Sequence, residues 1–150
     1  MYKDGESDFL QDIKKMTRMY EQPVNEKPTL LGIGQLENFK SILSEEVNEV
    51  DEIIEMYKKN EKNLSEENKI EILTSISDWL GDMVVYITNE ATKHGINLDE
   101  TLKIIMQSNF SKLDADGRPI KDERGKFLKG PNYWKPEPKI SELLKEKLGG

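Results

Sequence analysis

Five carboxylates in two groups dominate the residues of this chain that could do chemistry. Glu45, Glu46 and Glu49 lie together, and Asp78 and Asp82 follow about thirty residues later. On a helix, acids spaced by three or four residues project from the same side. Two such helices can form an all-oxygen cage, which suits a hard cation such as Mg²⁺. The spacing therefore predicts a Mg²⁺ site between two acidic helices.

Glu46 is the physically strongest member of this set. In a helix running from about Gln35 to Lys59, it falls inside the apolar stripe, whereas Glu45 points toward solvent. An ionised carboxylate in an apolar sector is costly unless a cation neutralises it. No Lys or Arg lies between Lys40 and Lys58. Glu46 therefore requires a positive charge from outside its own helix.

The second acidic segment lacks positive charge in the same way. From Ile70 to Thr92 there is no basic residue, although a surface helix usually alternates charges of opposite sign. Asp78 and Asp82 lie opposite the main apolar face of this segment. With 29 Asp and Glu residues in the chain, ordinary surface acids are the competing interpretation, and spacing alone leaves both open.

The elements that must position these acids follow from hydrophobic periodicity and capping residues. The predicted helices are Asp8–Tyr20, Gln35–Lys59, a segment capped by Ser65 that runs to about His94, Leu98–Phe110 capped by Asn97, and a short Ile140–Leu148. Gly-containing turns after Lys112 predict a small β-hairpin. We therefore expect a single domain over residues 1–150. Its fold class is all-α: an antiparallel four-helix bundle core over about 8–112, with a short C-terminal β-hairpin and irregular appendage over 113–150.

Composition narrows the function classes. The chain of 150 residues has no cysteine and one histidine, His94, which argues against thiolate or multi-histidine metal sites. A net charge of −7 argues against duplex nucleic acid as a partner. The N-terminus has no apolar signal segment and no run suits a membrane helix, so we expect a cytoplasmic protein. A phosphorylated substrate is compatible with this charge if a metal ion bridges the two.

Four segments in order carry a family resemblance, which extends from about Met19 to Pro138. They are residues 23–28 (PVNEKP), 45–49 (EEVNE), 78–86 (DWLGDMVVY), and the pair 108–113 (SNFSKL) and 128–134 (LKGPNYW). Together they resemble the all-α NTP pyrophosphohydrolase superfamily, which includes MazG, the dimeric dUTPases and the phosphoribosyl-ATP pyrophosphohydrolases. Residues 108–113 and 128–134 look like the C-terminal part of a MazG-like bacterial and phage subgroup.

The resemblance implies cleavage between the α and β phosphates of a nucleoside triphosphate, giving a monophosphate and pyrophosphate. It implies Mg²⁺, with Mn²⁺ as a substitute, and assigns Glu45, Glu46 and Glu49 to the metal, with Glu46 or Glu45 taking a proton from the attacking water. The family's second element is usually ExxD, and the position three before Asp82 is Trp79. Asp78, one residue earlier, is the acid expected to take that place.

Substrate contacts are expected from the C-terminal part of the chain. Lys112 and Lys129 lie in the family-like segments and are expected to meet phosphate oxygens, with Asn109 nearby. Trp79 and Tyr133 could stack on a base, and core packing is the alternative for Trp79. A half-bundle must bury its second apolar surface, which predicts a homodimer or homotetramer. Phosphoribosyl-ATP hydrolysis and a non-catalytic helical interaction module remain the alternative functions.

Overall fold

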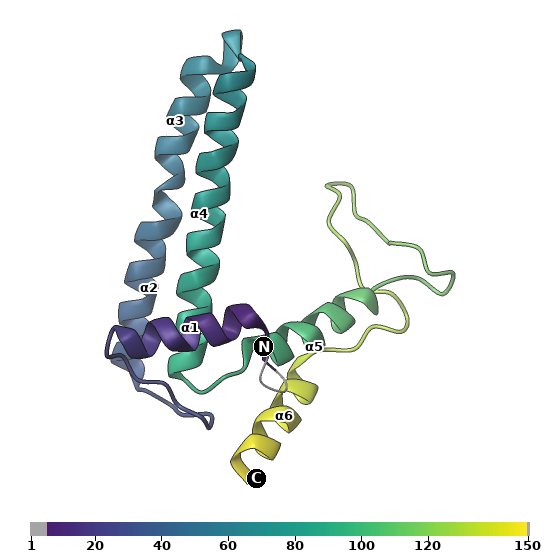
Figure 1. The fold of residues 1–150 in the computed structure, drawn as a ribbon. Helices are drawn as coiled ribbons and strands as arrows, with labels where there is room; N and C mark the ends of the chain where they lie inside the picture. Colours follow the sequence, from purple (N-terminus) through teal and green to yellow (C-terminus); the bar gives the residue numbers. More distant parts are fainter. Residues whose placement is uncertain (1–5, 150) are drawn as a thin grey trace.

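The computed structural model describes residues 6–149, and these residues fold into helices joined by loops (Figure 1). The helices are α1 (Asp8–Met19), α2 (Ile33–Asn48), α3 (Val50–Asn60), the short 3-10 helix η1 (Glu61–Asn63), α4 (Glu66–Lys93), α5 (Leu98–Phe110) and α6 (Glu137–Gly149). The predicted all-α fold class is confirmed. Within residues 6–149, none of the helices is both long enough and apolar enough to cross a bilayer.

A long two-helix arm dominates the shape of the molecule. Helices α2 and α3 follow one another along the arm, and α4 returns antiparallel beside them, in contact with both (Figure 1). Helix α1 crosses the base of the arm and packs on α4, while α5 and α6 lie beyond the turn that ends α4. One chain thus supplies two sides of a bundle along the arm, and the four-helix arrangement remains a prediction.

The helix starts follow the predicted capping chemistry. The Ser65 hydroxyl accepts from the main-chain N–H of Asn68 at 3.1 Å, and the Asn97 side chain accepts from that of Glu100 at 3.3 Å. Each bond satisfies a donor that the first helical turn leaves unpaired. The start of α4 and the start of α5 are therefore fixed by local sequence.

The base of the arm is held by a buried polar junction. The Glu90 carboxylate lies 2.8 Å from Nε2 of His94 and accepts from the side-chain amide of Gln35 at 2.9 Å. Leu10 and Ile13 of α1 are buried beside it against α4. The junction ties the first turn of α2 to the last turns of α4, so the two sides of the arm start in a defined register.

The predicted C-terminal β-hairpin does not form a strand in the described residues. One antiparallel bridge pairs Lys121 with Phe127. The Asp122 carboxylate accepts from the main-chain N–H groups of Arg124 and Lys126, both at 2.9 Å. Such side-chain bonds compete with strand pairing for backbone donors. The segment is therefore a looped appendage, and the final helix, α6, is longer than predicted.

Gly95 offers a direct test of the turn between α4 and α5. It has φ of +70°, and a Cβ atom there would overlap the main-chain oxygen of Lys27. Gly117 has a similar φ of +77° but open space around it. We expect Gly95→Ala to lower the free energy of unfolding by about 3 kcal/mol, the sum of left-handed strain and a forced backbone shift, against ~1 kcal/mol for Gly117→Ala. Equal losses in urea denaturation would contradict the close approach.

Candidate active site

The acidic helix is interrupted at the carboxylate motif, so the single helix predicted over Gln35–Lys59 is wrong in this respect. Glu49 separates α2 from α3, and its N–H donates to the Glu46 carbonyl at 3.2 Å. The N–H of Glu52 likewise donates to the Glu49 carbonyl at 3.2 Å. The indole N–H of Trp79 also donates to the Glu46 carbonyl, at 2.9 Å. A side chain that enters the main-chain ladder is a known cause of such breaks.

Glu46 is buried, as its place in the apolar stripe predicted. Its exposed fraction is 8%. Burial is the main effect that raises the pKa of Glu46 above its ordinary value of 4.5. The negative charges of Glu49 and Asp82, a hydrogen bond with the Glu49 side chain, and the charge of Asp78 raise this pKa further. Three of the other predicted carboxylates, one on its own side of the arm and two on α4, therefore act on Glu46.

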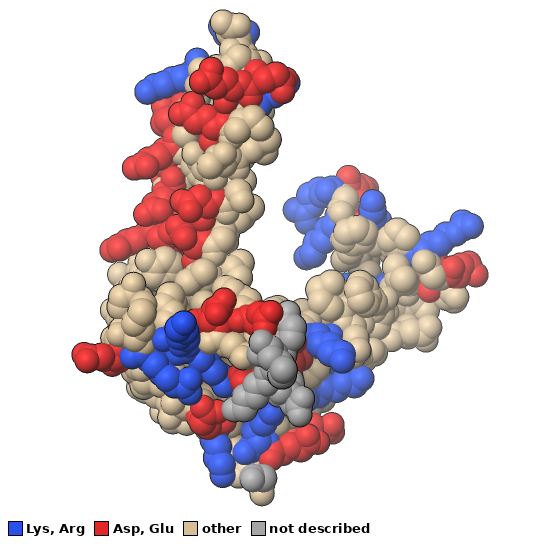
Figure 2. Space-filling view, viewed as in Figure 1, with Lys and Arg blue, Asp and Glu red and all other residues tan. Residues whose placement is uncertain are grey.

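No basic side chain compensates these acids. Among the ion pairs that residues 6–149 form, none involves a predicted metal-site carboxylate. Figure 2 shows acidic side chains along the α2–α3 side of the arm, with basic ones near its tip and over the base. Like charges held together without a counter-ion favour uptake of a cation. The uncompensated negative charge of the arm thus agrees with the Mg²⁺ site that the spacing of the acids predicts.

A shallow groove of about 180 Å³ lies between α3 and α4 beside this cluster. Its polar lining includes Glu49, Asp78 and Ser75, and Trp79 forms part of the wall. Glu52, an exposed residue of α3, also lines it. Glu52 was not among the predicted site residues, although its spacing of three residues from Glu49 puts both acids on one side of a helix.

Glu45 differs from the other four acids in one respect. Like Glu49, Asp78 and Asp82 it is exposed, but it is not among the groups that perturb the pKa of Glu46. Its assignment to the metal rests on the resemblance alone.

The donor set fits Mg²⁺ in chemistry, and the protein supplies only part of a coordination shell. All the candidate ligands are carboxylate oxygens, which hard cations prefer. Within residues 6–149, no three acidic or histidine side chains converge closely enough to hold an ion by themselves. Mg²⁺ in nucleotide enzymes is usually bound through one or two carboxylates, with water and substrate phosphates completing the shell. The arrangement is compatible with a site in which one or two carboxylates, water and substrate phosphates together complete the Mg²⁺ shell.

The predicted substrate residues lie at the far end of α5. The N–H of Gly130 donates to the carbonyl of Lys112 at 2.8 Å. This hydrogen bond joins the two family-like C-terminal segments. The Lys129 ammonium lies over the Tyr133 ring, 5.1 Å from its centre, and Asn109 is exposed one turn away at the end of α5. In one chain these four residues form a group separate from the arm. Trp79 is the predicted substrate residue that lies beside the carboxylates.

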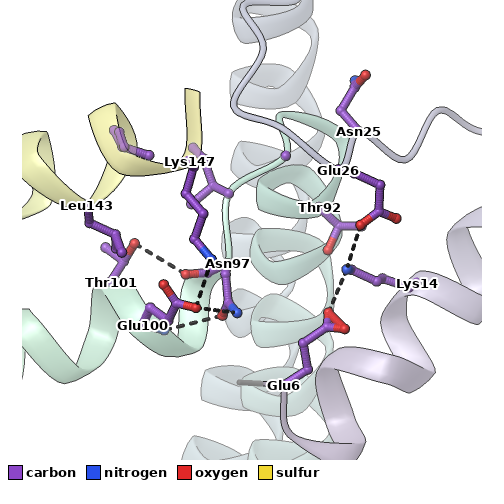
Figure 3. Close-up of a pocket in the computed structure, with 13 residues that line it drawn as sticks. Glu6, Lys14, Asn25, Glu26, Thr92, Asn97, Glu100, Thr101, Leu143 and Lys147 are labelled. Atoms are coloured by element: carbon purple, nitrogen blue, oxygen red, sulfur yellow. Dashed lines mark hydrogen bonds and ion pairs between the residues drawn. The ribbon is translucent and has the colours of Figure 1, made fainter. Parts of the chain in front are cut away.

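A second cavity, of 150 Å³, lies where α1, the α4–α5 turn and α6 meet (Figure 3). The Lys14 ammonium pairs there with Glu6 at 2.5 Å, and that of Lys147 with Glu100 at 3.2 Å. None of the predicted site residues lines it. Both of its lysines are engaged in ion pairs that connect neighbouring segments at the base of the arm.

Comparison with known proteins identifies the fold. No protein-family model matches the chain, and no curated protein is similar enough in sequence to count as a relative. Among solved structures, the chain matches that of a candidate NTP pyrophosphohydrolase from Exiguobacterium sp. 255-15, with a TM-score of 0.53 and 20% sequence identity. The match covers 96% of this chain and 98% of the other. The two proteins therefore share a fold along their whole length.

The raised pKa of Glu46 leads to a prediction about stability. A carboxyl group whose pKa is higher in the folded state adds stability below pH 4.5, and this contribution is lost as pH rises through the folded pKa. We therefore expect Glu46→Gln, without divalent metal, to raise the melting temperature at neutral pH by roughly 2–4 °C, which is about 1 kcal/mol for a chain of this size. The gain should vanish in acid.

The control for this measurement is Glu37→Gln, which removes an exposed carboxylate from α2. It should leave the melting temperature unchanged at both pH values. A Glu46→Gln protein that is less stable than wild type at neutral pH would show that the ionised carboxylate is satisfied within the folded chain.

Proposed function

We propose that this protein is a Mg²⁺-dependent nucleoside triphosphate pyrophosphohydrolase that cleaves between the α and β phosphates, with Mn²⁺ as an alternative metal. The observation that carries the proposal is Glu46, which is buried within the electrostatic reach of Glu49, Asp78 and Asp82 and forms no ion pair with a basic side chain of residues 6–149. Such a cluster suits a cation that arrives with a polyanionic substrate. The shared fold with a candidate NTP pyrophosphohydrolase supports the reaction class.

Each carboxylate has a role in this proposal. Glu46, Glu49, Asp78 and Asp82, with Glu45 from the exposed side of α2, provide the oxygens for the metal. When bound, Mg²⁺ neutralises phosphate charge and lowers the pKa of water. Glu46 is the proposed acceptor for the proton of the attacking water, because it is the buried carboxylate at the centre of the acidic cluster. Glu45 is the alternative base. The water is then directed in line at the α-phosphorus.

The substrate is held by groups outside the acidic cluster. Lys112 and Lys129 contact the β and γ phosphates, with Asn109 as a neutral hydrogen-bonding partner. The Tyr133 ring is available for a base, although Lys129 lies over it without substrate. The indole N–H of Trp79 is engaged by the Glu46 carbonyl, so the ring face is what Trp79 offers a base from the groove wall.

Association of chains completes this proposal. Along α4, Leu73, Leu80 and Val84 are 58%, 47% and 51% exposed. Exposed apolar residues in such a row favour contact with another protein surface. A second copy of the arm would bury them in a four-helix arrangement, as a homodimer or a homotetramer.

One observation favours a second candidate function, that of a non-catalytic interaction module. Trp79 occupies the position where the resemblance expects an acid, and its N–H is committed to the main chain. A helical interaction module that keeps the fold without the chemistry would tolerate that exchange. The two functions differ in whether the protein releases pyrophosphate.

An assay of pyrophosphate release tests the proposal. Purified protein is incubated with canonical and modified (d)NTPs and with phosphoribosyl-ATP, in Mg²⁺ or in EDTA. We expect release from at least one nucleoside triphosphate in Mg²⁺, none in EDTA, and a loss of about 10²-fold or more in kcat for Glu46→Ala, because a proton acceptor and a metal ligand are removed together. Glu37→Ala serves as the control and should retain full activity.

The results separate the candidates. Release from phosphoribosyl-ATP alone would replace the triphosphate substrate by that nucleotide. Absence of metal-dependent release from every nucleotide, with Glu46→Ala no different from wild type, would leave the interaction module.

The oligomeric state gives an independent test of association. Light scattering should yield a mass of two or four times the 17.3 kDa chain. Val84→Glu places a charge in the exposed apolar row and should shift the protein to the monomer mass, because burial of an unpaired carboxylate is costly. Thr74→Glu adds the same charge at an exposed polar position of α4 and should not. A monomeric wild-type protein at micromolar concentration would contradict association.

A further inference from the structure

Trp79 occupies an unusual place between the two sides of the arm. Its indole belongs to α4, yet its N–H donates at 2.9 Å to a main-chain oxygen of the opposite side, that of Glu46. The ring also lines the groove that Glu49, Glu52 and Asp78 share. One side chain thus contacts the backbone of the most buried of the predicted site carboxylates and forms part of the wall of the adjoining groove.

The bond replaces part of the normal helical ladder. In an unbroken α-helix, the Glu46 carbonyl would accept from the N–H of Val50, four residues later. Here it accepts from the N–H of Glu49 and from the indole of Trp79. The chain consequently tightens at Glu49 and resumes as α3 at Val50. The indole therefore stabilises the break from across the arm.

The carboxylates of the proposed site lie around this bond. Glu46, whose carbonyl accepts from the indole, is buried within the electrostatic reach of Glu49 and Asp82. Glu49 and Asp78 line the groove whose wall includes the Trp79 ring. The indole therefore contacts the main chain of Glu46 and the groove that two neighbouring acids line.

We infer that Trp79 is a positioning residue of the carboxylate site. It does not supply an oxygen where the resemblance expects one, but holds the main chain of Glu46 and so sets the position of this carboxylate relative to Glu49 and Asp82. The inference rests on the proposed metal-dependent function, because the acids are aimed at a cation. Residues that orient metal ligands without touching the metal commonly change affinity by about 10–100-fold when removed.

Binding of Mn²⁺ alone, measured by electron paramagnetic resonance without nucleotide, tests the inference. Trp79→Phe keeps an aromatic ring and removes the N–H donor. We expect its Kd for Mn²⁺ to rise about tenfold or more. Tyr57→Phe, which removes a polar group from an exposed aromatic ring on the same arm, should bind Mn²⁺ as wild type does. Circular dichroism of each variant checks that the helices are intact.

A second substitution separates positioning from packing. Site-specific incorporation of 3-benzothienylalanine at position 79 keeps the bicyclic shape and replaces N–H by sulfur. It should weaken Mn²⁺ binding as Trp79→Phe does, whereas a residue that only packs would show wild-type affinity with the isostere. Wild-type affinity in that protein would overturn the inference and leave the proposed function intact. A wild-type protein that neither binds Mn²⁺ nor releases pyrophosphate would overturn both.

Discussion

Crowding of like charges around Glu46 is the physical constraint on which the proposed site depends. Glu46 is buried within the electrostatic reach of Glu49, Asp78 and Asp82, and each of them disfavours its ionised form. The two sides of the arm are held together by other contacts, among them buried Ile53 of α3 and Ile72 of α4. The junction of Glu90, His94 and Gln35 and the packing of α1 on α4 supply further contacts at the base. The acids can therefore face one another in the folded chain at some cost in stability.

The proposed function gives a reason for this cost in stability. A cluster of like charges is unfavourable alone and favourable once a cation and a phosphate chain enter it, so binding energy is directed at the complex in which the reaction occurs. The same argument explains why the described carboxylates form only part of a metal shell. A cage complete without substrate would leave few positions for phosphate oxygens and for the attacking water.

The sequence predicted the features that depend on neighbours along the chain. Helix types, the caps at Ser65 and Asn97, and the burial of Glu46 follow from local periodicity and from the absence of nearby Lys or Arg. The break at Glu49 could not be predicted in the same way, because the indole that donates to the neighbouring Glu46 carbonyl belongs to Trp79, thirty-three positions after Glu46. The missing strand pairing follows from Asp122, whose carboxylate takes the backbone donors of its own turn.

The geometry of α4 connects the proposed site to the proposed assembly. At about 100° per residue, Asp78 and Asp82 lie on one side of this helix, and Leu73, Leu80 and Val84 lie on the opposite side. The second copy that buries the apolar row therefore need not cover the acids, which stay open to substrate. Within one chain, Lys112 and Lys129 lie beyond α5, apart from the acidic arm (Figure 1). If they contact the phosphates as proposed, the appendage must approach an arm, either its own or that of another copy. Assembly would then act on catalysis through substrate binding, with the carboxylates themselves positioned within each chain.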